Sequence, residues 1–79
     1  MKIIVTEQDI RIGNKADCNF CPIALAGQRA LGRPVTVSCY NIYGGRNDRY
    51  PLPKKAQEFI CLFDKGEKVG PFEFEVFQF

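Results

Sequence analysis

The C-terminal segment, residues 72–79, constrains the fold of this chain more than any other part of the sequence. Its first five residues alternate apolar and acidic side chains, Phe-Glu-Phe-Glu-Val. A period of two is typical of a β-strand with one buried face. Phe72, Phe74 and Val76 are therefore expected to face a hydrophobic core, in a strand that closes a small sheet.

Phe77 and Phe79 do not fit this pattern. They fall on the face of the strand that carries Glu73 and Glu75, which is expected to contact water. Either another part of the chain covers these rings, or they form a surface for self-association or for a partner, as exposed apolar patches often do. Cys61 raises the same question, because it falls outside the apolar stripe of its predicted helix. Phe77, Phe79 and Cys61 are therefore candidate interface residues.

The length of 79 residues leaves room for one compact domain, residues 1–79. Hydrophobic residues make up 46% of the chain, which is enough for a core and argues against disorder. Burial alone stabilises a domain of this size only narrowly, so we expect oligomerisation, a metal or unusually good packing to add to it.

The charge balance is too even to indicate a strong electrostatic binder. The 11 basic and 9 acidic residues leave a net charge of +2, so duplex DNA is not an expected partner. No signal segment and no run of about 18 apolar residues occurs, which predicts a cytoplasmic protein without a membrane partner. Histidine is absent, and with it the usual general base at neutral pH. No catalytic constellation stands out, and we do not expect an enzyme.

Local patterns predict an α+β fold with the order β-α-α-β-β-α-β. A small mixed or antiparallel sheet of three to four strands is expected to pack against two to three helices. The predicted strands cover residues 1–5, 35–43, 49–50 and 72–79. The predicted helices run from the N-cap Thr6 through Ile12, from Cys18 to Leu31, and from Pro53 or Lys54 to about Asp64.

Apolar side chains recur at helical spacing in the second predicted helix. Phe20, Ile23, Ala24, Gly27 and Leu31 share one face, and we expect this face to be buried. The glycine on that face costs helix propensity, so it is expected to allow a close approach of the sheet.

Other segments also show a buried face. In the strand 35–43, Val35, Val37 and Cys39 are expected to face the helices. In the last helix, the inward stripe is expected to contain Ala56, Phe59, Ile60 and Phe63.

The four cysteines allow three interpretations. The first interpretation is a redox pair, because Cys18-x-x-Cys21 lies at a predicted helix start, where a thiolate has a lowered pKa. A zinc site formed by Cys18, Cys21, Cys39 and Cys61 is the second, although the latter two lack close spacing. The third is that all are reduced thiols, with Cys21 and Cys39 packed as small core residues.

The loop between Tyr43 and Tyr50 is the strongest candidate for ligand contact. Two glycines, Arg46 and Arg49 lie between these flanking aromatic residues. Guanidinium groups bind phosphates and aromatic rings stack on bases, so the loop could hold a nucleotide or another small anionic ligand. The same composition is also typical of an ordinary solvated hairpin loop.

Three motifs are distributed over most of the chain, between residues 21 and 74. They are Cys21-Pro22-Ile23-Ala24-Leu25-Ala26, Leu52-Pro53-x-x-Ala56-x-x-Phe59-Ile60-x-x-Phe63-Asp64-x-Gly66 and Pro71-Phe72-Glu73-Phe74. In these motifs the chain resembles a group of small uncharacterised proteins encoded by bacteriophages and prophages. The resemblance implies an accessory factor that binds a host protein or sequesters a signalling nucleotide during infection. It implies no catalytic or binding residue.

The leading hypothesis is a non-enzymatic phage accessory protein in the cytoplasm of an infected or lysogenic bacterial host. It would bind a host or defence protein, as a homo-oligomer and without a cofactor. The first alternative is a nucleotide or nucleic-acid binder that uses Tyr43, Arg46, Arg49 and Tyr50. The second is a module that zinc stabilises through the four cysteines.

Overall fold

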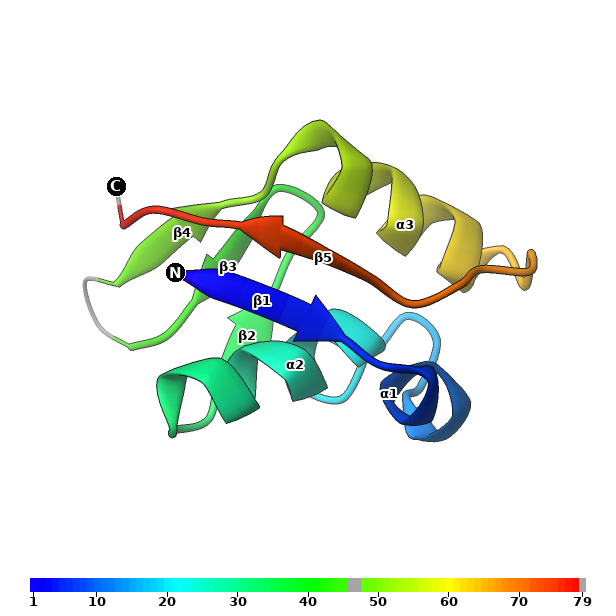
Figure 1. The fold of residues 1–79 in the computed structure, drawn as a ribbon, viewed down its shortest axis with the longest axis horizontal. Helices are drawn as coiled ribbons and strands as arrows, with labels where there is room; N and C mark the ends of the chain where they lie inside the picture. Colours follow the sequence, from blue (N-terminus) through cyan, green and yellow to red (C-terminus); the bar gives the residue numbers. More distant parts are fainter. Residues whose placement is uncertain (46–47, 79) are drawn as a thin grey trace.

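The computed structural model describes residues 1–45 and 48–78, which form two antiparallel sheets and three helices (Figure 1). The strands are β1 (Lys2–Val5), β2 (Thr36–Val37), β3 (Asn41–Tyr43), β4 (Arg49–Pro51) and β5 (Phe72–Glu75), and the helices are α1 (Glu7–Ile12), α2 (Pro22–Leu31) and α3 (Lys54–Asp64). This is the α+β class that the sequence predicts, with one strand more than expected. No helix in the described ranges is long and apolar enough to cross a membrane.

The additional strand arises because the predicted strand 35–43 folds back on itself. The Ser38 hydroxyl accepts hydrogen bonds from the backbone N–H groups of Tyr40, at 3.2 Å, and Asn41, at 3.0 Å. These bonds close a turn, and β2 and β3 pair as antiparallel neighbours on either side of it. Cys39 lies in the turn and is exposed, so the expectation that it faces the helices is wrong.

The C-terminal strand pairs with β1 alone, in a sheet of two strands. The register places Phe74 opposite Ile3, and both side chains are buried. The pairing extends past β5, because the Met1 amino group donates to the Val76 carbonyl at 2.8 Å and the Val76 N–H donates to the Met1 carbonyl at 2.9 Å. The predicted inward face of this strand is therefore confirmed. The strands form two small sheets, however, whereas the sequence predicted one.

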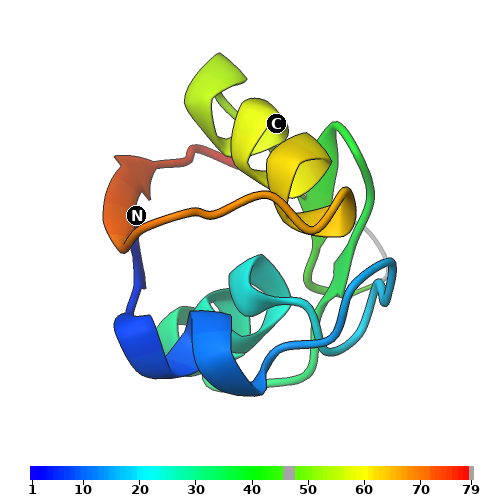
Figure 2. The same cartoon turned by 90° about the vertical axis from the view of Figure 1, so that its right-hand side faces the viewer.

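One hydrophobic core lies between the two sheets. Figure 2 shows β1 and β5 on one side of it, the three-stranded sheet on the other, and α3 and α2 closing the two remaining sides. The buried apolar residues are Ile3, Val5, Cys21, Ile23, Ala24, Ala26, Val35, Val37, Ile42, Tyr50, Leu52, Ala56, Phe59, Phe63, Phe74 and Val76. The stripe predicted for the last helix is confirmed, with Ile60 half-buried at its edge.

The second helix starts later than the apolar spacing suggests. The Asp17 carboxylate accepts hydrogen bonds from the N–H groups of Asn19 and Phe20, at 3.0 and 3.1 Å, and this forms a turn before Pro22. The turn directs Phe20 outward, where 53% of it is exposed. The prediction that Phe20 shares the buried face of this helix is therefore wrong.

The ends of α2 match the local signals in the sequence. Pro22 occupies the first turn, where its missing N–H costs no hydrogen bond, and Gly32 ends the helix in a left-handed conformation with φ 72°. Gly27 lies on the buried face, and a Cβ there would lie 3.3 Å from Val35 Cγ2. The expected close approach of strand and helix at this glycine is thus confirmed.

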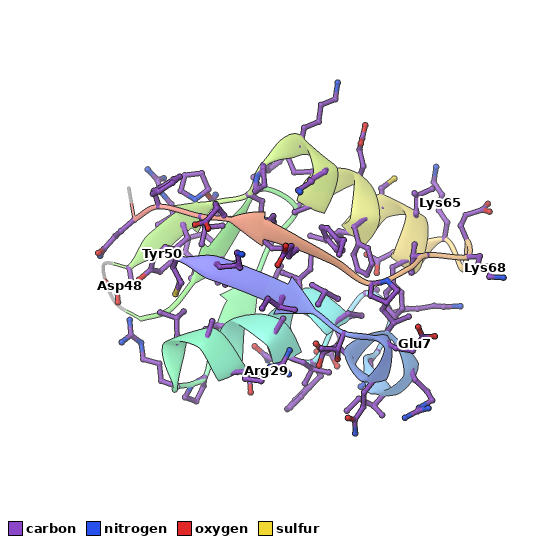
Figure 3. The ribbon with its side chains drawn as sticks, in the orientation of Figure 1. Glu7, Arg29, Asp48, Tyr50, Lys65 and Lys68 are labelled. Atoms are coloured by element: carbon purple, nitrogen blue, oxygen red, sulfur yellow. The ribbon has the colours of Figure 1, made fainter. Side chains whose placement is uncertain are left out.

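An ion pair between a buried carboxylate and a half-exposed arginine connects α1, α2 and β1. Asp9 is 3% exposed, and its two carboxylate oxygens accept hydrogen bonds from Arg29, at 3.1 Å to Nη1 and 2.7 Å to Nη2. The same Nη2 donates to the Ile4 carbonyl at 2.8 Å, and Figure 3 labels Arg29 on α2. Asp9 also accepts from the N–H of Thr6 at 2.9 Å, and its own N–H donates to the Thr6 hydroxyl at 3.1 Å. This capping box confirms the predicted N-cap.

These contacts change the acidity of Asp9. Burial by itself raises the pKa of the carboxyl, but the hydrogen bonds from Arg29 and Thr6, together with the charge of Arg29, outweigh it. The pKa of Asp9 therefore lies below its ordinary value. A carboxyl group with a lowered pKa stabilises the fold above its unfolded-state pKa, and this contribution is lost as the pH falls through the folded-state pKa.

We expect Asp9→Asn to lower the free energy of unfolding by about 1–3 kcal/mol near neutral pH, because a charge-assisted pair at a helix start is lost. The difference from the wild type should begin to shrink below about pH 4, where the carboxyl of the unfolded chain takes up its proton, and should keep shrinking until the pH falls through the lower pKa of the folded state. Urea unfolding between about pH 3 and 7 measures both effects. Glu7→Gln, an exposed change in the same turn, is the control. A difference that stays constant down to the lowest pH would contradict the assignment.

Candidate functional site

The predicted ligand loop is the turn of the β3–β4 hairpin, and the structure divides its residues between two faces. Tyr43 pairs with Arg49 and Ile42 pairs with Tyr50, so Tyr43 and Arg49 share the exposed face. Tyr50 lies on the opposite face and is buried in the core. Its prediction as a ligand residue is therefore wrong, because the register of β4 turns it inward. Arg46 lies outside the described residues.

A residue that the sequence did not single out positions the end of this hairpin. The Arg33 guanidinium donates to the Gly44 carbonyl at 2.5 Å and forms an ion pair with Asp48. Asp48 also accepts a hydrogen bond from Gln78 at 2.7 Å, which connects the hairpin to the C-terminal segment. Figure 3 shows Asp48 and Tyr50 at the same end of the molecule. No local pattern marks Arg33, because its partners are distant in the sequence.

The four thiols line two neighbouring grooves beside α3. Cys18, Cys21 and Cys39 line a groove of about 300 Å³, and Cys39 and Cys61 line another of about 470 Å³. All four are free cysteines. Within residues 1–45 and 48–78, however, no group of three or more Cys, Asp or Glu side chains is placed to hold a metal ion. The predicted four-cysteine zinc cluster is therefore not formed.

Cys21 caps the N-terminus of α2. Its Sγ accepts a hydrogen bond from the Ala24 N–H at 3.4 Å, and its side chain is buried. Burial raises the pKa of this thiol, and the hydrogen bonds from Ala24 and Ile23 offset the shift only in part. A redox pair needs a thiol with a lowered pKa, so this environment does not fit the redox interpretation of Cys18 and Cys21.

The strand that closes the β1–β5 sheet leads into an exposed apolar surface. Phe77 is 74% exposed, and it lies beside a groove of about 460 Å³ that is also lined by Pro51, Leu52, Pro53 and Val76. These five residues are called the C-terminal patch below. Leu52 and Val76 are buried, whereas the prolines and Phe77 reach the solvent. Of the two alternatives that the sequence left open for Phe77, the structure shows the exposed one.

The other two predicted interface residues do not belong to the C-terminal patch. Cys61 is exposed on α3, as the helical spacing indicates, but it lines the groove that contains Tyr40 and Ile60. Phe79 lies outside the described residues. The sequence missed Tyr40, which is exposed in the turn between β2 and β3. Its position in the strand pattern gave no sign of this turn.

We expect a thiol reagent to distinguish Cys21 from the three exposed cysteines. In the native protein Cys18, Cys39 and Cys61 should react first, and Cys21 at least about 10-fold more slowly, because its thiol is buried and less ionised. Titration with a chromogenic disulfide, with and without urea, measures this. Cys21→Ser keeps an N-cap oxygen and should remove only the slow phase. A slow phase that persists in this variant would contradict the assignment.

These grooves and patches are the features from which function can be inferred, because no relative supplies it. No family model matches this chain, and no curated protein and no solved structure is similar enough to count as a match.

Proposed function

We propose that this chain is a small non-enzymatic accessory protein of the phage type, which self-associates through the C-terminal patch and acts by binding a host protein. The observation that carries the proposal is Phe77, a large aromatic side chain that is 74% exposed next to an apolar groove. Exposed apolar surface of this kind is a feature of protein interfaces. The resemblance to bacteriophage and prophage proteins supports the assignment to the accessory class.

The shape of the C-terminal patch favours a second copy of the chain as its occupant. Phe77 protrudes beside the groove that Pro51, Leu52 and Pro53 line. A protruding ring and a groove on the same surface can be matched by a two-fold axis, so that each copy inserts its Phe77 into the groove of the other. Such an isologous contact would bury the aromatic ring, which is the kind of residue that dominates interface energies.

Charges around the C-terminal patch are compatible with the same symmetry. Glu75 lines the groove, and Lys54 and Lys55 are exposed directly after Pro53. An isologous interface brings each surface against itself, so a rim with both signs allows lysines of one copy to approach the glutamate of the other. A rim with charges of only one sign would repel the same rim of the second copy.

The shifted titratable groups support binding, not catalysis, as the mode of action. Asp9 and Cys21 are both buried, and the pKa of each is shifted by burial together with contacts that hold a helix start. Asp9 is 3% exposed, and Cys21, although it lines a groove, is 8% exposed and its thiol caps α2. Both groups therefore stabilise the N-terminus of a helix in the folded protein.

A separate surface remains for a host protein when the C-terminal patch is covered. Tyr40 is 67% exposed, more than any large apolar residue of the described ranges except Phe77, and it lines the groove with Ile60 and Cys61. Asp64 and Lys65 lie at the same groove, and Figure 3 labels Lys65 near the end of α3. An aromatic residue inside a mixed-charge rim has the composition of a protein-binding surface.

We expect the wild type to form a dimer of about twice the 9.0 kDa chain mass, and Phe77→Asp to raise its dissociation constant by at least about 10-fold. Light scattering and sedimentation over a concentration series measure this. Ile12→Asp changes an exposed apolar residue of α1, outside the C-terminal patch, and should leave the dimer intact. A monomeric wild type at about 100 µM would overturn the self-association.

Host binding is tested with Tyr40→Asp. We expect a host protein retained by the immobilised wild type and by Ile12→Asp to lose at least about 10-fold in affinity for Tyr40→Asp, because an aromatic anchor is removed. The retained protein is purified and its affinity for each variant is measured by calorimetry. Retention of no host protein, or equal affinity for all variants, would count against this role.

A further inference from the structure

A further groove, in addition to the three described above, lies where the turn before α2 meets the β2–β3 strands. It has a volume of about 540 Å³, and its lining includes Asn19, Phe20, Gln28, Thr36, Tyr43 and Gly45. We call it the hairpin groove. It belongs to neither surface discussed above. Its volume is within the range of about 300–1,000 Å³ that is common for small-molecule sites.

Two aromatic rings stand exposed at the hairpin groove. Phe20 is 53% exposed and Tyr43 is 39% exposed. Neither ring stacks on another ring of residues 1–45 or 48–78, where the ring contacts involve Phe59, Phe63, Phe72 and Phe74. Both lie on backbone that hydrogen bonds hold, since Asp17 accepts from the Phe20 N–H and β3 pairs on both sides. The rings are thus presented to a ligand at low cost in entropy.

Polar side chains from α2, from the turn before it and from β2 also line the hairpin groove. Gln28 Nε2 donates to the Asn19 carbonyl at 3.0 Å, and the Thr36 hydroxyl donates to Asn19 Oδ1 at 3.1 Å. These two bonds orient the Asn19 and Gln28 amides. Asn19 Nδ2 and Gln28 Oε1 then have no partner among the described residues, which leaves one donor and one acceptor at the groove. A nucleobase edge presents the complementary pair.

Two arginines lie next to residues of the groove lining, without lining the groove themselves. Arg49 is directly opposite Tyr43 across the strand pair and shares its face. Arg33 binds the carbonyl of Gly44, next to Gly45 in the groove lining, although Asp48 balances its charge. A phosphate attached to a base in the groove would therefore meet a guanidinium group on this side.

We propose that the hairpin groove binds a nucleoside phosphate, with the base stacked on Phe20 and Tyr43, its edge at Asn19 and Gln28, and its phosphate toward Arg49. The ligand is a free nucleotide or one unit of a single-stranded nucleic acid, which share this chemistry. The site differs from the loop that the sequence suggested, because Tyr50 is in the core and Phe20 takes the place of the second ring.

Calorimetry with the four ribonucleoside monophosphates tests the base contact. We expect Tyr43→Ala and Phe20→Ala each to weaken binding by about 10- to 100-fold, because base stacking on an aromatic ring is lost. Tyr43→Phe keeps the ring and should bind like the wild type. Ile12→Ala shortens an exposed apolar side chain outside the groove and is the control. Absence of binding by the wild type at about 1 mM, or wild-type affinity of both alanine variants, would overturn the proposal.

The phosphate contact and the source of the ligand need two further comparisons. The wild type should bind each nucleotide more tightly than its nucleoside, and Arg49→Gln should remove this difference without changing the nucleoside affinity. An equal affinity of the wild type for nucleotide and nucleoside would refute the phosphate contact. Single-stranded RNA of about eight nucleotides that binds more tightly than any mononucleotide would identify a strand as the ligand, whereas equal or weaker binding would identify a free nucleotide. Phe77→Asp should bind as the wild type does, so this proposal and the self-association fail independently.

Discussion

The carboxylate of Asp9 is the contact on which the arrangement of the N-terminal half depends. It is buried, and every charge-bearing oxygen is matched by a donor from Arg29 or Thr6. A buried carboxylate without such donors is costly, so the three elements that supply or position them must be placed together. Arg29 also binds the Ile4 carbonyl, which connects β1 to α2 at the same point. One ion pair thus defines how a strand and two helices meet.

The positions of the proposed binding surfaces depend on this contact between β1, α1 and α2. Because β1 is held against α2, its register with β5 decides where the chain leaves the sheet, and Phe77 emerges beside Pro51 and Pro53. Because α2 is held at the same point, the turn before it presents Phe20 to the groove that contains Tyr43. The C-terminal patch and the hairpin groove have different linings. The proposed self-association and the proposed ligand binding would therefore use different residues.

Patterns that involve only a few neighbouring residues predicted the local structure correctly. Thr6 and Asp9 form a capping box, Pro22 starts a helix, Gly32 ends it, and the alternation in residues 72–76 predicts the buried face of β5. Errors arose where short-range polar contacts interrupt an apolar pattern. The Asp17 carboxylate turns Phe20 outward, and the Ser38 hydroxyl bends the chain so that Cys39 is exposed. The spacing of hydrophobic residues alone does not reveal such turns.

By itself, the sequence determined the class of the fold, most helix limits and the inward residues of β5, because capping and periodicity act between near neighbours. Only the tertiary structure decided that Tyr50 is in the core, that Arg29 pairs with Asp9, and that Phe20 and Tyr43 share a groove. Each of these depends on strand register or on contacts between residues far apart in the chain. Such contacts form only when the packed core selects one arrangement among many that local patterns allow.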